Sequence, residues 1–142
     1  MFLFKVKGRE AVRLDTYEGM RVHLHTTALG KSILAHLPEE RMEEILDERG
    51  LPSVTPNTIT NREELLSDLD LVRERGYAID DEERLEGIRC IAAPIVTEGD
   101  NVLGAVSISG PRNRLRGERF REEIPSQVLG TSNIISVNVR HM

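Results

Sequence analysis

The chain has 142 residues, 39% hydrophobic and 30% charged, which suits one globular domain with a single core. Its formal net charge of −5 argues against nucleic-acid binding by this chain alone, because such binding requires a basic surface. No apolar stretch approaches the roughly 20 residues that span a bilayer, and a single cysteine excludes an internal disulfide and fits a reducing, cytoplasmic setting.

Strands are predicted at the start of the chain. Residues Phe2–Val6 and Ala11–Asp15 read as two strands joined at Gly8-Arg9-Glu10. Residues Arg21–His25 alternate polar and apolar side chains, which predicts a short third strand. Because the chain opens inside strand-like sequence, we expect the natural protein to begin earlier.

Two helices are predicted next. Thr26 or Thr27 can cap the first, whose apolar positions run from Ala28 to Leu37. The second covers Glu39–Arg49 and ends before Gly50, a residue type that suits the position just past a helix.

A third helix is predicted from the pattern Thr60-Asn61-Arg62-Glu63, which is a capping box with Thr60 as the cap. Gly76 stops this helix, and Tyr77–Ile79 is a short strand. The acidic run Asp80–Glu83 follows, and a solvated loop is the default for such a run. Asp80 ends the strand directly and could point inward.

A β-hairpin is the most informative feature. Two apolar runs, Ile88–Val96 and Val102–Ser109, flank a turn at residues 97–101. The residues near the centre of this hairpin are small and weakly polar: Cys90, Ala92, Ala93, Ser107 and Ser109. Small side chains leave room, and hydroxyls and a thiol can form hydrogen bonds, so we expect a polar pocket for a small molecule.

The C-terminal segment allows two interpretations. Ile124–Val139 follows helical spacing, although Ile134–Val139 also alternates like a strand; we favour a helix with Pro125 in its first turn. The arginines between Arg112 and Arg121 are most simply a solvated face.

Taken together, the predicted elements form an α+β domain, an antiparallel sheet with helices packed on it.

Three blocks of sequence carry a resemblance to a known family. They are His25-Thr26-Thr27-Ala28-Leu29-Gly30-Lys31; Thr58-Ile59-Thr60 with Gly76-Tyr77-Ala78-Ile79-Asp80-Asp81-Glu82-Glu83; and Gly87 to Ile95 with Ser107-Ile108-Ser109-Gly110-Pro111. In this order and spacing they resemble the effector-binding domain of the IclR family of transcription regulators.

The resemblance implies a GAF-like fold for the whole of residues 1–142. It also implies that a winged helix-turn-helix domain and the first strand of the sensor domain are missing from this chain, so that DNA is contacted only through that missing domain. Family members form dimers or tetramers, so we expect self-association. The expected ligand is a small-molecule effector, most simply a small carboxylate.

The resemblance also implies which residues line the ligand site. They are Ala28 and Leu29 at a helix start, Asp80 after the short strand, Ile88 and Cys90 in the hairpin, and Ser107 and Ser109 in its second strand. Backbone N–H groups at a helix start favour a carboxylate, and serine hydroxyls can donate to ligand oxygens. Asp80 would accept hydrogen bonds from a ligand hydroxyl or from water.

Simpler interpretations stay open for these residues. Cys90 is most often a small buried side chain, and a catalytic thiolate would need a basic partner. Lys31 is a surface residue or a salt-bridge partner, and the serines could face solvent. We expect no enzyme activity, no metal and no cofactor. The alternatives are an oligomerisation module without a functional pocket, or a thiol-dependent enzyme using Cys90.

Overall fold

The computed structural model describes residues 23–97, 99 and 101–140. The elements are, in chain order, a 3-10 helix η1 (Leu24–Thr26), α1 (Ala28–His36), α2 (Glu39–Arg49), α3 (Arg62–Arg75), β1 (Ala78–Asp81), β2 (Ile88–Val96), β3 (Val102–Pro111), a π-helical turn η3 (Arg119–Glu123) and α4 (Ile124–Arg140). The strands predicted at Phe2–Val6 and Ala11–Asp15 lie outside the described residues.

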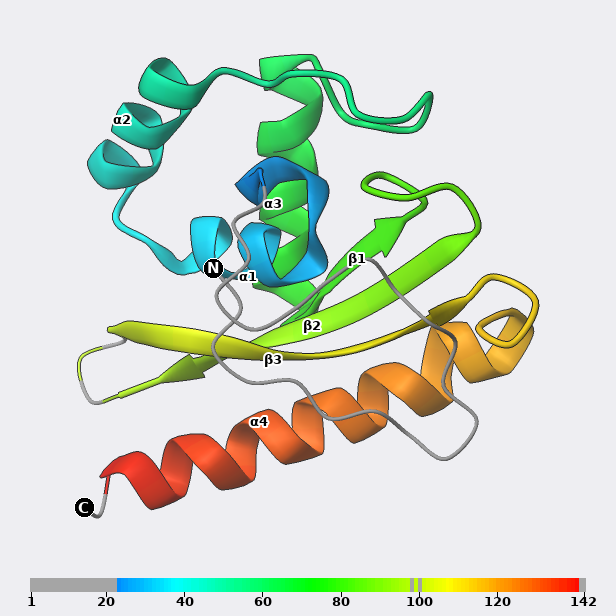
Figure 1. Ribbon diagram of the computed structural model, residues 1–142. Coiled ribbons are helices and arrows are strands. Elements are labelled where there is room, and N and C mark those ends of the chain that lie inside the picture. The colour runs from blue at the N-terminus through cyan, green and yellow to red at the C-terminus, as the bar shows by residue number, and fades with distance from the viewer. Residues whose placement is uncertain (1–22, 98, 100, 141–142) are drawn as a thin grey trace.

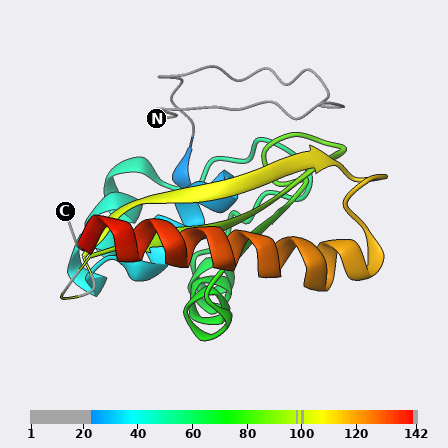
Figure 2. The ribbon, with the colours of Figure 1, turned by 90° about the horizontal axis from the view of Figure 1, so that it is seen from below.

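Helices cover both faces of an antiparallel sheet (Figure 1). The described strands lie in the order β1-β2-β3. Helices α1, α2 and α3 lie on one side of this sheet, and α4 runs along the other side, as the view from below also shows (Figure 2). The α+β prediction is therefore confirmed.

The alternation of side chains along β2 supplies both halves of the core. Ala92 faces a cluster built from α1, α2 and α3, whereas Ile91 and Ala93 face a second cluster with α4. Ala92 is fully buried, and its small side chain lets α1 approach the sheet closely. The site predicted from the hairpin lies on the α1 side.

The ends of α2 and α3 are confirmed as predicted. Gly50 has φ 65° and its N–H donates to the carbonyl of Leu46 at 2.9 Å. Gly76 adopts the left-handed conformation with φ 88°, and its N–H donates to Val72 at 2.8 Å. A glycine accepts positive φ without the steric cost of a Cβ, so these two residues mark the helix ends locally. The C-terminal helix with Pro125 in its first turn is also confirmed.

The strand predicted at Arg21–His25 is wrong for its described part. Leu24–Thr26 forms the 3-10 helix η1. Thr26 donates to the carbonyl of His23 twice, from its backbone N–H at 3.2 Å and from its hydroxyl at 2.8 Å. This local side-chain hydrogen bond competes with strand formation, and the alternating pattern does not reveal it.

The cap predicted for α3 is displaced by one residue. Asn61, not Thr60, is the N-cap, and its side chain accepts from the N–H of Glu64 at 3.1 Å. The strand after α3 also differs from the prediction, since β1 covers Ala78–Asp81 rather than Tyr77–Ile79. Similarly, β3 extends two residues beyond Ser109, to Pro111.

The cap assignment predicts unequal effects of two neighbouring substitutions. Asn61→Ala removes the acceptor for Glu64 and should lower the free energy of unfolding by about 1 kcal/mol. Thr60→Ala is the matched control and should change it by less than about 0.5 kcal/mol. Urea unfolding of both variants measures this, and a larger loss for Thr60→Ala would restore Thr60 as the cap.

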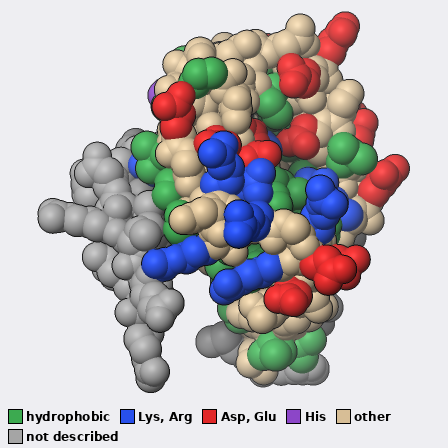
Figure 3. Space-filling view, turned by 90° about the vertical axis from the view of Figure 1, so that its right-hand side faces the viewer, with side chains coloured by type: hydrophobic (Ala, Val, Ile, Leu, Met, Phe, Trp, Pro, Cys, Tyr) green, Lys and Arg blue, Asp and Glu red, His purple; other side chains and the backbone are tan. Residues whose placement is uncertain are grey.

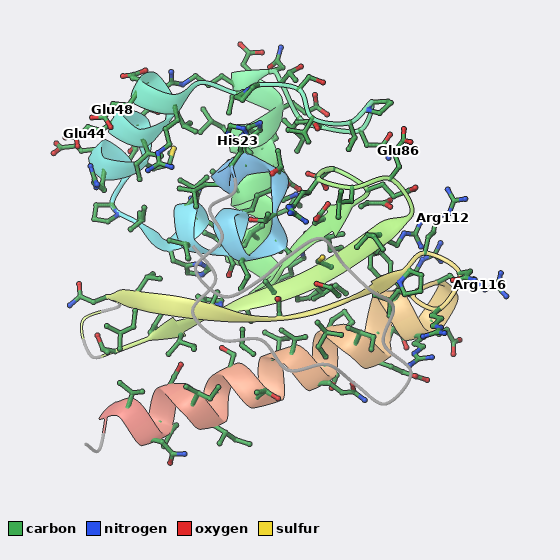
Figure 4. The ribbon with its side chains drawn as sticks, in the orientation of Figure 1. His23, Glu44, Glu48, Glu86, Arg112 and Arg116 are labelled. Atoms are coloured by element: carbon green, nitrogen blue, oxygen red, sulfur yellow. The ribbon has the colours of Figure 1, made fainter. Side chains whose placement is uncertain are left out.

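Exposed charged side chains of both signs occur over the surface. Exposed arginines gather at one end of the sheet, on the face shown in Figure 3, and Arg112 and Arg116 point away from the fold (Figure 4). The solvated face predicted for Arg112–Arg121 is confirmed. Glu44 and Glu48 point outward from α2 at the opposite side of the molecule (Figure 4). None of the described helices has the length and apolarity needed to span a membrane.

Candidate functional site

Strand register brings three predicted site residues into one row across the sheet. Asp80 pairs with Cys90, and Cys90 pairs with Ser109. We call these three residues the Asp80–Ser109 row. Ile88 and Ser107 lie two positions from Cys90 and Ser109, respectively, and so share the same face. All five predicted strand residues thus face the side covered by α1.

The start of α1 lies over this face. Ala28, Leu29 and Cys90 belong to one packed cluster. Thr27 caps α1, and its hydroxyl accepts from the N–H of Gly30 at 2.9 Å, which confirms the predicted cap. Among the described residues, no acceptor is found for the backbone N–H groups of Ala28 and Leu29. Within the described part of the chain these two donors are unpaired, and they lie at the positive end of the helix dipole.

Solvent exposure increases along the row from Asp80 to Ser109. Asp80 is buried, Cys90 is half-buried and Ser109 is exposed, while Ser107 is half-buried. Two hollows occur elsewhere in the described part of the chain: a cavity of about 10 Å³ lined by residues of η1, α1 and α2, and an open depression over the acidic side chains of α2. Neither includes a predicted site residue, so the ligand site remains a prediction.

Cys90 lies between two polar partners. Its Sγ is 2.9 Å from the hydroxyl of Ser109. Burial, followed by the negative charge of Asp80, raises the pKa of the Cys90 thiol to about 12. At neutral pH the thiol is therefore protonated and a poor nucleophile. This position suits a side chain that lines a site rather than one that attacks a substrate.

Asp80 points inward, as one interpretation of the acidic run allowed. Its carboxylate accepts from the backbone N–H of Glu83 at 2.8 Å and also from that of Arg84. Burial is the main reason why its pKa rises to about 6, and the loop N–H groups and Lys31 act in the opposite direction. Asp80 can therefore change its protonation state near neutral pH.

Lys31 lies at the centre of a buried ion cluster that sequence reasoning did not find. Its Nζ is 2.8 Å from a carboxylate oxygen of Glu83 and 2.8 Å from one of Asp68, and only 1% of its side chain is exposed. The salt-bridge interpretation of Lys31 is confirmed, whereas a surface position is wrong. The cluster joins α1, α3 and the loop after β1.

A solvated loop, the default for the acidic run, is wrong for Glu83. Glu83 is buried, and its second carboxylate oxygen accepts from the N–H of Asp81 at 2.9 Å. Two threonine hydroxyls also hold the loop: Thr58 donates to the carbonyl of Glu83 at 2.6 Å, and Thr55 donates to that of Glu82 at 2.6 Å. Burial of Glu83 is possible because Lys31 and these bonds replace water.

A close backbone contact orients the start of α1. A Cβ built on Gly30 would lie 2.1 Å from the carbonyl oxygen of Leu24. Only glycine therefore fits where η1 passes α1. This close packing is a sufficient reason for a glycine at position 30, within the first sequence block.

The arrangement defines an α+β domain whose polar sheet face lies under a helix start. The chain matches the family described as "Bacterial transcriptional regulator IclR C-terminal" over residues 1–137. The chain belongs to this family. The resemblance found in the sequence blocks is thereby confirmed.

Relatives and solved structures agree with this assignment. The chain is 41% identical over 140 residues to "Probable HTH-type transcriptional regulator ArcR" of Halobacterium salinarum, covering 96% of this chain and 53% of ArcR. The chain thus spans about half the length of this relative. The crystal structure of the C-terminal domain of the Escherichia coli transcriptional regulator KdgR superposes with a TM-score of 0.78 at 37% identity, covering 84% of this chain and 73% of that one.

One neighbour contains a ligand. It is the inducer-binding domain of a double mutant of the PobR transcription factor from Acinetobacter, in complex with 3-hydroxybenzoic acid. Its TM-score is 0.80 at 26% identity, and the match covers 91% of this chain and 74% of that one. The matched relatives are transcriptional regulators rather than enzymes.

Proposed function

We propose that this domain binds a small carboxylate effector between the start of α1 and the Asp80–Ser109 row. The observation that supports this most directly is the pair of N–H groups of Ala28 and Leu29, which have no acceptor among the described residues and lie beside a row of polar side chains. The N–H groups would bind the carboxylate, and Ser107 and Ser109 would orient it. The acid held by the PobR domain is a ligand of this chemical class.

Effector binding in the whole regulator would change DNA binding by a helix-turn-helix segment that lies outside this chain. Such coupling requires that the effector bind two states of the regulator with different affinities. Self-association of the domain would provide the contacts that differ between these states. We place the protein in the cytoplasm, where both metabolites and DNA are available.

A carboxylate should therefore raise the melting temperature of the domain. The panel is acetate, lactate, succinate and 3-hydroxybenzoate at millimolar concentration, measured by thermal shift at pH 6.5. Ser107→Ala/Ser109→Ala removes two hydroxyl donors, and each hydrogen bond to a charged group contributes about 1.5–3 kcal/mol. We expect the double variant to fold and to bind the same acid at least tenfold more weakly.

The matched control is Ser67→Ala/Ser126→Ala, which removes two exposed hydroxyls on α3 and α4. It should leave the shift unchanged. An equal shift in the Ser107/Ser109 variant would contradict the role of these serines. No shift with any acid in the panel would favour the alternative, an oligomerisation module without a functional pocket.

A further inference from the structure

The ion cluster behind the proposed site carries more negative than positive charge. Lys31 supplies one ammonium group, and both Glu83 and Asp68 contact it at 2.8 Å. One cation is thus already shared by two carboxylates. Asp80 is a third carboxyl group, only 2% exposed, and it forms hydrogen bonds with backbone N–H groups and with the thiol of Cys90.

Titratable and charged groups face this cluster from each surrounding element. They are His25 in η1, Lys31 in α1, Asp68 in α3, Glu83 and Arg84 in the loop after β1, and Cys90 in β2. Burial lowers the pKa of His25, which disfavours its charged form. The cations here are thus Lys31 and Arg84, against the three carboxyl groups of Asp68, Asp80 and Glu83. The thiol of Cys90 is neutral.

Of the three carboxyl groups, Asp80 is the one that belongs to the row proposed to face the ligand. It pairs with Cys90 across the sheet, and Cys90 Sγ is in turn 2.9 Å from the hydroxyl of Ser109. A carboxylate held over this row would add a fourth negative charge on the same sheet face. In a poorly hydrated environment two neighbouring carboxylates disfavour joint ionisation.

We propose that binding of a carboxylate effector is coupled to the uptake of one proton by Asp80. This inference rests on the proposed function. The proton leaves the solvent and binds a carboxylate oxygen of Asp80, and the protonated group then becomes a hydrogen-bond donor within the cluster. The effector itself stays ionised, so that the buried charge does not increase when the site fills.

The coupling has a definite direction with pH. The pKa of Asp80 without ligand is about 6, and a neighbouring anion raises it further. Between these two pKa values the complex binds one more proton than the free domain. Affinity for the acid should therefore fall by up to about tenfold for each pH unit between pH 6 and the pKa of Asp80 in the complex, and should be level well below 6.

The first experiment needs no ligand. The carboxyl carbon of Asp80 is followed by ¹³C NMR from pH 4 to 8 in the free domain, with Asp80→Asn to assign the signal. We expect a midpoint between pH 5 and 7. A midpoint at or below 4 would overturn the proposal, because Asp80 would then be fully ionised and tightly held at neutral pH.

The second experiment measures the proton directly. Calorimetry with 3-hydroxybenzoate, or with whichever panel acid gives the largest thermal shift, is run at pH 6.5 and 7.5 in two buffers of different ionisation enthalpy. The wild type should take up a fraction of a proton approaching one. Asp80→Asn should take up none and should bind with the same affinity at both pH values.

Asp81→Asn is the matched control. Asp81 lies on the opposite face of β1, where it accepts from Arg89 at 2.8 Å, and its replacement should leave the proton uptake unchanged. Binding without proton uptake in the wild type would overturn the inference and leave the proposed function standing. Absence of binding by every acid would instead contradict the proposed function.

Discussion

Replacing Lys31 with methionine should destabilise this domain more than any exposed charge substitution. Only 1% of the Lys31 side chain is exposed, and its ammonium contacts Glu83 and Asp68 at 2.8 Å. Methionine leaves the buried Glu83 carboxylate without its cation. Removing one partner of a buried ion pair costs about 3–5 kcal/mol, and we expect a loss in this range for Lys31→Met at pH 7.5.

The loss should become smaller as the pH is lowered. Burial already raises the pKa of Glu83 above its ordinary value, although Lys31 acts against this. Without Lys31 that pKa rises further, while the pKa of Glu83 in the unfolded chain does not change. Between the two values only the folded state binds the proton, so the variant gains stability as the pH falls through this window.

Urea unfolding at pH 7.5 and 5 measures both effects. The control is Arg41→Met, which removes an exposed ion pair with Glu44 on α2 and should cost less than about 1 kcal/mol. The double variant Lys31→Met/Glu83→Gln should recover part of the loss, because no unpaired carboxylate is then left at position 83. A loss below about 1 kcal/mol for Lys31→Met would show that the cluster does not stabilise the fold.

Gly30→Ala should destabilise the domain by about 3 kcal/mol, in the upper part of the range for overpacking. The added Cβ would lie 2.1 Å from the carbonyl oxygen of Leu24 and 2.6 Å from its Cα. These are backbone atoms, so no side-chain rotation relieves the contact. Either η1 or the start of α1 must move, which would also displace the N–H groups of Ala28 and Leu29.

Gly130→Ala is the matched control, because it makes the same change within a helix. Gly130 lies in α4, and a Cβ there would meet no atom within 4 Å. Alanine costs less conformational entropy than glycine in a helix, so this variant should be stabilised by about 0.5–1 kcal/mol. Thermal unfolding compares the two, and equal melting temperatures would refute the close contact at Gly30.

Local signals explain why the helices could be predicted. Gly50 and Gly76 adopt positive φ at the ends of α2 and α3, and Thr27 caps α1 through its own side chain. Each signal acts within a few residues of the element that it ends or begins. The same local basis explains the error in the cap of α3, because Asn61 stands beside Thr60 and both residue types can cap a helix.

Only part of the candidate site could be predicted from such local signals. The spacing of Ser107 and Ser109 by two residues is enough to place both on one face of a strand, and the register agrees with this. Which strand residues lie opposite them depends on pairing, which sequence alternation does not specify. Only the sheet places Asp80 beside Cys90 and Cys90 beside Ser109.

Sequence alone thus determined the family, the α+β class and most helix ends, because these depend on residue patterns and short-range bonds. The tertiary structure decided the burial of Lys31 and Glu83. These residues lie 52 positions apart, and Lys31 and Asp68 lie 37 positions apart. A run of four acids favours solvent on its own, and the cost of burying Glu83 is offset by a cation brought from α1 together with local hydrogen bonds.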